Sequence, residues 1–69
     1  MDVEEIEKRF TYHPPKEGQP AIYQSIRGAA KNLALQINEA CPDSREKAIA
    51  LTKLEEFVMW VNAGIARNE

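Results

Sequence analysis

The feature that most limits the fold of this chain is a very short break between two long helical patterns. Residues 19–40 and residues 44–67 both consist mainly of good helix formers, and only three residues separate them. Pro42 ends the first helix, Asp43 is suited to cap the second, and Glu46 matches a capping box. So short a connection forces the two helices into an antiparallel hairpin. The sequence therefore predicts an all-α fold in one domain.

Each of the two predicted long helices carries one apolar face. In residues 19–40, the stripe is expected to consist of Ile22, Ile26, Ala29 or Ala30, Leu33, Ile37 and Ala40. In residues 44–67, the apolar side chains alternate in steps of three and four, as in a coiled-coil seam. They are Leu51, Leu54, Val58, Val61 and Ile65. We expect these two faces to pack against each other.

Apolar side chains outside these two faces predict self-association. They are Leu35, Ile49, Phe57, Met59 and Trp60. A hairpin has only one inner face, and exposed aromatic patches usually mark an association surface. We therefore expect a homo-oligomer in which Phe57 and Trp60 pack between subunits. In the alternative, the N-terminal part of the chain folds back and covers them.

The size of the chain favours the same conclusion. A domain of 69 residues buries only about 60% of its unfolded surface, so it usually needs an additional stabilising device. Cys41 is the only cysteine and cannot form an internal disulfide, and one His with one Cys does not make a zinc site. Self-association is the device that remains, and we expect no bound metal.

Ahead of the hairpin, the stretch FTYHPPKEGQP can form neither a helix nor a central strand. Pro14 and Pro15 lack backbone donors and hold φ near one value, and a glycine precedes a third proline. We expect residues 11–18 to form a fixed, irregular segment, here named the proline strap. Residues 3–10 predict a short helix with apolar residues spaced three and four apart. Alone it is too short to persist, so it must dock on the rest of the chain.

The charge balance excludes some classes of partner. Nine basic and eleven acidic residues give a formal net charge of −2, whereas a general DNA or RNA binder normally carries a basic excess. No apolar run approaches the roughly 20 residues of a membrane-spanning helix, and the acidic N-terminus is unlike a signal peptide. We expect a cytoplasmic protein, with Cys41 reduced, that binds neither polymeric nucleic acid nor membranes.

No catalytic constellation is visible in the sequence. It lacks a Ser/His/Asp or Cys/His arrangement with a local signature, a phosphate loop and a two-histidine metal motif. Glu55 and Glu56 are adjacent, so they point in different directions on a helix and are poor partners for acid–base chemistry. We expect no enzymatic activity and no cofactor.

A polar face on residues 19–40 favours binding instead. It is formed by Gln24, Arg27, Lys31 and Asn38. Such a face is most often only solvated, but Tyr12 and His13 lie in the strap shortly before it. An aromatic ring can stack on a base, and a guanidinium can hold two phosphate oxygens. Tyr12, His13, Arg27 and Lys31 are therefore candidate contacts to a small nucleotide.

Two polar residues near the end of the sequence are further candidates. Asn62 lies among apolar neighbours, and an amide at a packed position must find hydrogen-bond partners. It is either an intersubunit hydrogen bond or a ligand contact. Arg67 lies near a predicted helix C-terminus, where a cation is favoured in any case.

The combination of FTYHPPKEGQP with CPDSREKAIALTKLEEFVMWVNAGIARNE resembles the small phage-encoded anti-CBASS family of cyclic-oligonucleotide sponges. These helical hairpin proteins are also similar to an anti-Thoeris sponge, and the resemblance runs from about Phe10 to Glu69. It implies a homohexamer of α-hairpins in the host bacterial cytoplasm. Such a protein captures cyclic nucleotide messengers of bacterial immune cyclases without cleaving them, and so keeps the effector proteins silent.

The resemblance also implies ligands and site residues. In that family, cyclic dinucleotides such as cGAMP lie between paired protomers. An aromatic residue of the strap stacks on a base there, and a basic residue of the following helix holds the phosphates. By position these residues are Tyr12 and Arg27. Some members also take cyclic trinucleotides in a separate pocket near the helix ends, which implies Asn62 and Arg67.

A different class of function also fits the apolar surplus. The chain could be a structural or adaptor hairpin that binds a host protein through exposed Phe57 and Trp60. This alternative predicts no nucleotide binding.

Overall fold

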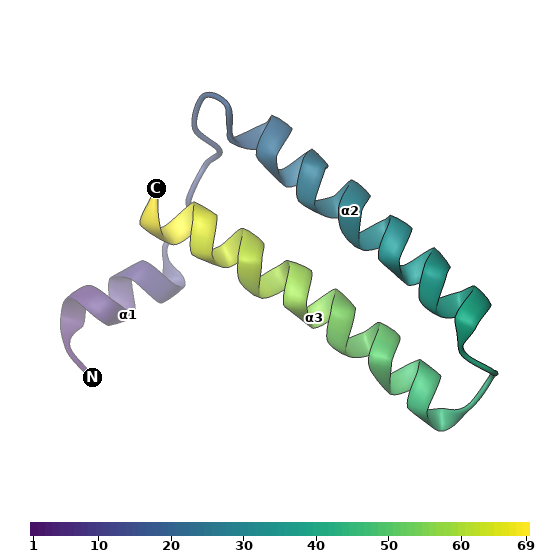
Figure 1. Cartoon of the computed structure of the whole chain (residues 1–69). Helices are drawn as coiled ribbons and strands as arrows, with labels where there is room; N and C mark the ends of the chain where they lie inside the picture. Colours follow the sequence, from purple (N-terminus) through teal and green to yellow (C-terminus); the bar gives the residue numbers. More distant parts are fainter.

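The computed structural model describes residues 1–69 and consists of three α-helices without a strand (Figure 1). Helix α1 spans Val3–Phe10, α2 spans Gln19–Ala40 and α3 spans Arg45–Asn68. The first two have the bounds expected from the sequence, and α3 begins and ends one residue later. The all-helical hairpin that the sequence predicts is therefore confirmed. None of the three helices is both long and apolar enough to cross a bilayer.

The short helix α1 is stabilised by charged groups at its two ends. Asp2 caps the helix start, because its carboxylate accepts a hydrogen bond of 2.9 Å from the backbone N–H of Glu5. One turn later, Arg9 donates to the Glu5 carboxylate at 3.1 Å. Acidic groups in the first turn and basic groups in the last turn also match the helix dipole. These contacts favour the helix locally, but they bury none of its apolar side chains.

The turn between α2 and α3 is capped differently from the sequence-based expectation. Ser44 caps α3 instead of Asp43, since its Oγ accepts from the backbone N–H of Lys47 at 3.1 Å. Glu46 is the second residue of α3, so the predicted capping box does not form. The Asp43 carboxylate pairs with the Lys47 ammonium at 2.8 Å. The prediction was wrong because Lys47 offers this carboxylate a charged partner.

Lys47 closes the hairpin turn from the side of α3. Its ammonium also donates to the backbone carbonyl of Asn38 at 3.0 Å, near the end of α2, where carbonyls lack a helical partner. In this position Lys47 is almost fully covered, and only 8% of the residue is exposed. The hydrogen bond and the charge of Lys47 lower the pKa of Asp43.

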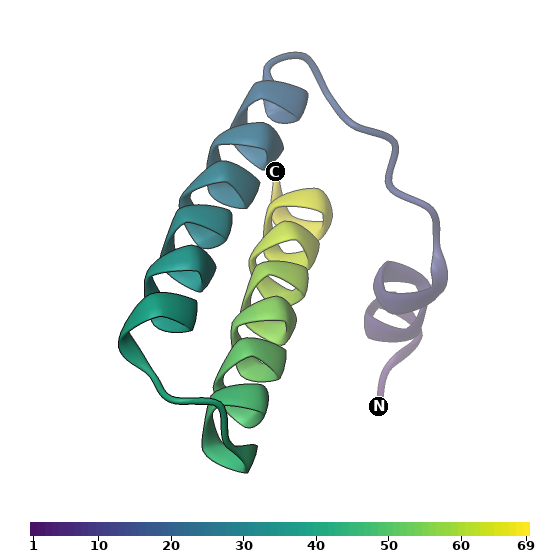
Figure 2. The ribbon, with the colours of Figure 1, turned by 90° about the vertical axis from the view of Figure 1, so that its right-hand side faces the viewer.

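Helices α2 and α3 run antiparallel and side by side (Figure 1, Figure 2). The predicted seam of α3 is confirmed, because all five of its residues are half buried. The predicted stripe of α2 is correct only in part, since Ile22, Leu33 and Ala40 are exposed. The half-buried residues of α2 are Tyr23, Ile26, Ala30, Ala34 and Ile37. Helix α2 therefore turns Ala30 and Ala34 toward α3 instead of Leu33, so it is rotated from the expected orientation.

The molecule is a single layer of helices. Its dimensions are 45 × 30 × 12 Å, and the smallest is about the diameter of one helix. Helix α3 lies between α2 and α1 (Figure 2). A protein core normally forms between two packed layers. Accordingly, no apolar side chain of this chain is fully buried.

One layer leaves much apolar surface in contact with solvent. The accessible surface is 5708 Å², whereas a compact protein of this mass exposes about 4,400 Å². Phe57 is 61% exposed and Trp60 is 69% exposed. The alternative in which the N-terminal segment covers these two rings is therefore wrong for a single chain. The excess of about 1,300 Å² is surface that a partner could bury.

Candidate functional site

The proline strap is held at both ends by hydrogen bonds. At the α1 end, the half-buried ring of His13 shares a hydrogen bond of 2.8 Å between its Nε2 and the Lys8 carbonyl. At the α2 end, the backbone N–H of Lys16 donates to the side-chain oxygen of Gln19 at 2.9 Å. The backbone N–H of Gln19 donates to the Lys16 carbonyl at 3.0 Å. Gly18 lies between them with φ of 84°, a conformation that favours glycine.

Tyr12 is the strap residue whose side chain stays free for a ligand. It is 79% exposed, although its neighbour His13 fixes the strap beside it. A ring that projects from a fixed backbone loses less freedom on binding than a ring on a mobile loop. Its exposure and placement suit the stacking role, which stays a prediction. His13, by contrast, already uses one ring nitrogen for the fold.

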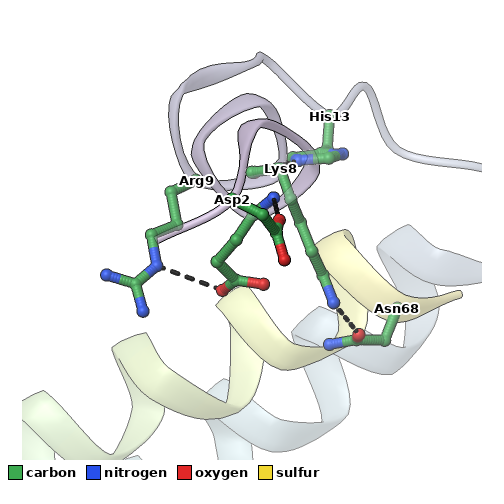
Figure 3. A network of polar contacts seen from close by, with 6 residues as sticks. Asp2, Lys8, Arg9, His13 and Asn68 are labelled. Atoms are coloured by element: carbon green, nitrogen blue, oxygen red, sulfur yellow. Dashed lines mark hydrogen bonds and ion pairs between the residues drawn. The ribbon is translucent and has the colours of Figure 1, made fainter.

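A polar network connects α1 to the last turn of α3 (Figure 3). The Lys8 ammonium donates to Oδ1 of Asn68 at 2.6 Å, and Nδ2 of Asn68 donates to the Gly64 carbonyl at 2.9 Å. The ammonium of Lys16 also donates to the Glu69 carbonyl. Sequence reasoning missed Lys8 and Asn68, because residues 60 positions apart share no periodic pattern. No local signal in the sequence could have joined them.

Arg27 and Lys31 line an open groove of about 400 Å³ between α2 and α3. Both side chains are exposed, and they are one turn apart on the same helix. The lining also contains Glu55 of α3 and five apolar residues, Ala30, Leu51, Leu54, Val58 and Met59. Two cations beside apolar side chains can hold an anionic group next to a flat ring.

Asn62 and Arg67 lie in the C-terminal half of α3. Oδ1 of Asn62 is buried and has no hydrogen-bond partner, which is costly for a polar atom. This oxygen is already covered within the single chain, so the intersubunit hydrogen bond and the ligand contact both stay predictions. Arg67 is half buried and lines an open groove of about 390 Å³ that reaches from Trp60 to Arg9 of α1.

Within one chain, the candidate residues occupy three separate places. They are Tyr12 and His13 in the strap, Arg27 and Lys31 on α2, and Asn62 and Arg67 on α3. No strap residue lines the groove that holds Arg27 and Lys31. The structure therefore brings Arg27 and Lys31 together in one groove, but it joins neither the strap pair to that groove nor Asn62 to the groove of Arg67.

These places offer exposed groups that are able to bind a ligand noncovalently. An exposed phenol ring can stack, and the cations can pair with phosphate. No group of three or more His, Cys, Asp or Glu side chains is arranged to hold a metal ion. Fold and surface together define a single-layer helical hairpin with exposed aromatic and cationic patches.

Comparison with known families places the chain more closely. A sequence model of the family described as "Acb2/Tad1, hairpin domain" matches residues 1–66. The chain belongs to this Acb2/Tad1 hairpin family, which is the anti-CBASS family that its sequence resembles. No curated protein and no solved structure matches the chain significantly. Membership links the chain to anti-CBASS proteins.

Proposed function

We propose that this protein is a phage immune-evasion protein that binds and sequesters cyclic oligonucleotide second messengers without cleaving them. Its ligands are cyclic dinucleotides such as cGAMP, with cyclic trinucleotides as a second class. By lowering the free messenger concentration in the host cytoplasm, it prevents the activation of CBASS effectors. The family match over residues 1–66 is the observation that carries this proposal.

The exposed groups of the chain support nucleotide binding. Tyr12 offers a ring face, and stacking on a base contributes about 1–3 kcal/mol. Arg27 can hold two phosphate oxygens at once, and Lys31 adds a second cation on the same groove. For the second ligand class we propose Arg67, which lines a groove with Trp60, and Asn62, whose covered oxygen would have to become accessible in the assembly.

Self-association completes the proposed site. The excess surface of about 1,300 Å² is larger than the roughly 800 Å² that each partner buries in a standard interface. In the proposed homohexamer, Phe57 and Trp60 pack between copies. Tyr12 of one copy and Arg27 of another then share one ligand, which accounts for their separation within a single chain.

Sequestration requires affinity and stoichiometry but no chemical step. An improvement from micromolar to nanomolar affinity corresponds to about 4 kcal/mol. One stacked base with one charge-assisted phosphate contact, duplicated by the symmetry of a cyclic dinucleotide, reaches that scale. The protein must then only exceed the messenger in concentration.

Substitution of Tyr12 tests the proposed site. Tyr12→Ala removes the stacking ring, so affinity for a cyclic dinucleotide is expected to fall at least about tenfold in calorimetric titration. Tyr12→Phe keeps the ring and is the matched control, with affinity within about threefold of the native protein. Circular dichroism should be the same for both. If Tyr12→Ala binds as tightly as the native protein, the base of the ligand does not stack on Tyr12 and this site assignment is wrong.

The fate of the ligand separates a sponge from an enzyme. The complex is heated to precipitate the protein, and the supernatant is analysed by chromatography. Intact cyclic dinucleotide in stoichiometric yield supports sequestration. A linear or shortened product would mean that the chain is a hydrolase and that sequestration without cleavage is wrong.

The exposure of Phe57 and Trp60 favours one other candidate, an adaptor hairpin that binds a host protein. A thermal-shift screen with cyclic di- and trinucleotides discriminates between the two. A ligand at a hundred times its dissociation constant stabilises a binder by about 2.7 kcal/mol per site. No shift with any of them, together with Trp60 emission that changes with protein concentration, favours the adaptor.

A further inference from the structure

None of the apolar side chains of helix α1 is buried in this chain. Its apolar residues Val3, Ile6 and Phe10 are all exposed, so hydrophobic burial does not hold it against α3. A helix of eight residues is also too short to be stable on its own. The placement of α1 therefore depends on its few polar contacts.

Lys8 connects α1 with two other parts of the molecule. Its ammonium donates to Asn68 on the last turn of α3 at 2.6 Å, and its carbonyl accepts the 2.8 Å hydrogen bond from His13 in the strap (Figure 3). Asn68 is oriented for this contact, because its Nδ2 donates to the Gly64 carbonyl and leaves Oδ1 free to accept. One residue thus links α3, α1 and the strap.

This linkage determines where Tyr12 lies. Tyr12 directly precedes His13, so its backbone position follows that of the Lys8 carbonyl. On the other side of the prolines, Lys16 donates to the Glu69 carbonyl. The strap is thereby connected to the C-terminal end of the chain directly through Lys16, and indirectly through His13 and Lys8 of α1.

We propose that Lys8 and Asn68 are positioning residues for the ligand site at Tyr12. Their hydrogen bond docks α1 on α3 and holds the strap in the conformation that presents the Tyr12 ring. When the bond is lost, α1 separates from α3, and the strap must be ordered anew each time a ligand binds. That ordering lowers affinity. The part of this inference that concerns the ligand rests on the proposed function.

A double-mutant cycle tests the inference on the full chain. Lys8→Met and Asn68→Ala are each expected to weaken binding of a cyclic dinucleotide about fivefold to tenfold, the scale of one charge-assisted hydrogen bond. The double variant is expected to bind no more weakly than either single variant, because both substitutions remove the same contact.

Two further variants serve as controls. Lys8→Arg keeps a cationic donor and should restore affinity. Lys53→Met, on an exposed lysine elsewhere on α3, is the control that leaves affinity unchanged.

Amide hydrogen exchange of the ligand-free protein supplies a second readout. Amides of α1 and of Tyr12 and His13 should exchange faster in both single variants, while those of α2 and α3 keep their rates. Additive losses of affinity in the cycle, or unchanged exchange in α1, would overturn the inference. If the native protein binds no cyclic nucleotide, the proposed function fails, and the exchange data alone decide whether Lys8 and Asn68 dock α1.

Discussion

The two residues that this chain buries are both polar, and each closes a turn. Gln19 is 5% exposed and joins the strap to α2, while Lys47 is 8% exposed and joins α2 to α3. Buried polar groups contribute stability only when they are hydrogen-bonded, and both of these are. At the scale of single residues, the geometry of the chain therefore depends on polar contacts at its turns.

Replacement of Lys47 tests this dependence. Lys47→Met keeps the stem of the side chain but leaves the Asn38 carbonyl without its donor, so the free energy of unfolding is expected to fall by about 1–2 kcal/mol. In the same variant the pKa of Asp43 should rise toward its ordinary value, as measured by NMR titration, because its cationic partner is gone. Lys53→Met is the matched control, since Lys53 is exposed. Equal melting temperatures for the two variants would contradict the account.

Single residues also mark the limit of what the sequence could predict. Fixed-φ prolines after Tyr12 single it out in the sequence, and its ring is exposed, but its contact with a ligand stays a prediction. Asp43 was chosen as a cap on type and position, but Ser44 takes that role because Lys47 attracts the carboxylate. Such a choice between two adjacent capping residues depends on a side chain four positions away, which local rules do not weigh.

At the scale of helices, the sequence predicted the elements better than their orientation. Prolines and caps delimit α2 and α3, and the three–four alternation of branched residues identified the inner face of α3. Helix α2 carries two overlapping stripes, one with Ile22 and Leu33 and one with Ala30 and Ala34. The larger residues suggested the first stripe, whereas the fit against α3 selects the second. Packing against a partner helix decides between such stripes, and hydrophobicity alone does not.

Two substitutions on α2 test which face is inside. Ile37→Gln places an amide against α3 and is expected to lower the free energy of unfolding by about 2 kcal/mol or more. Leu33→Gln alters an exposed position and should leave the helix pair folded. Urea unfolding followed by circular dichroism, at several protein concentrations, measures both. A larger loss for Leu33→Gln at every concentration would mean that the expected stripe was the correct one.

Taken as a whole, the hairpin is more extended than a compact globular domain of the same length. Its radius of gyration is 15.3 Å, against about 11 Å for a compact domain of this length. One layer of helices leaves Phe57 and Trp60 in solvent, and separates Tyr12 from the groove of Arg27. Association of copies would remedy both features at once, by burying the rings and by bringing strap and groove together.

Molar mass by light scattering, across dilution and with Trp60 fluorescence recorded in parallel, tests this claim most directly. The account predicts a stable multiple of 7.8 kDa, about 47 kDa for six copies, with blue-shifted Trp60 emission. It also predicts that Trp60→Glu lowers the mass and abolishes cyclic dinucleotide binding together. A folded protein that stays at 7.8 kDa at all concentrations, with Trp60 in water, would contradict it.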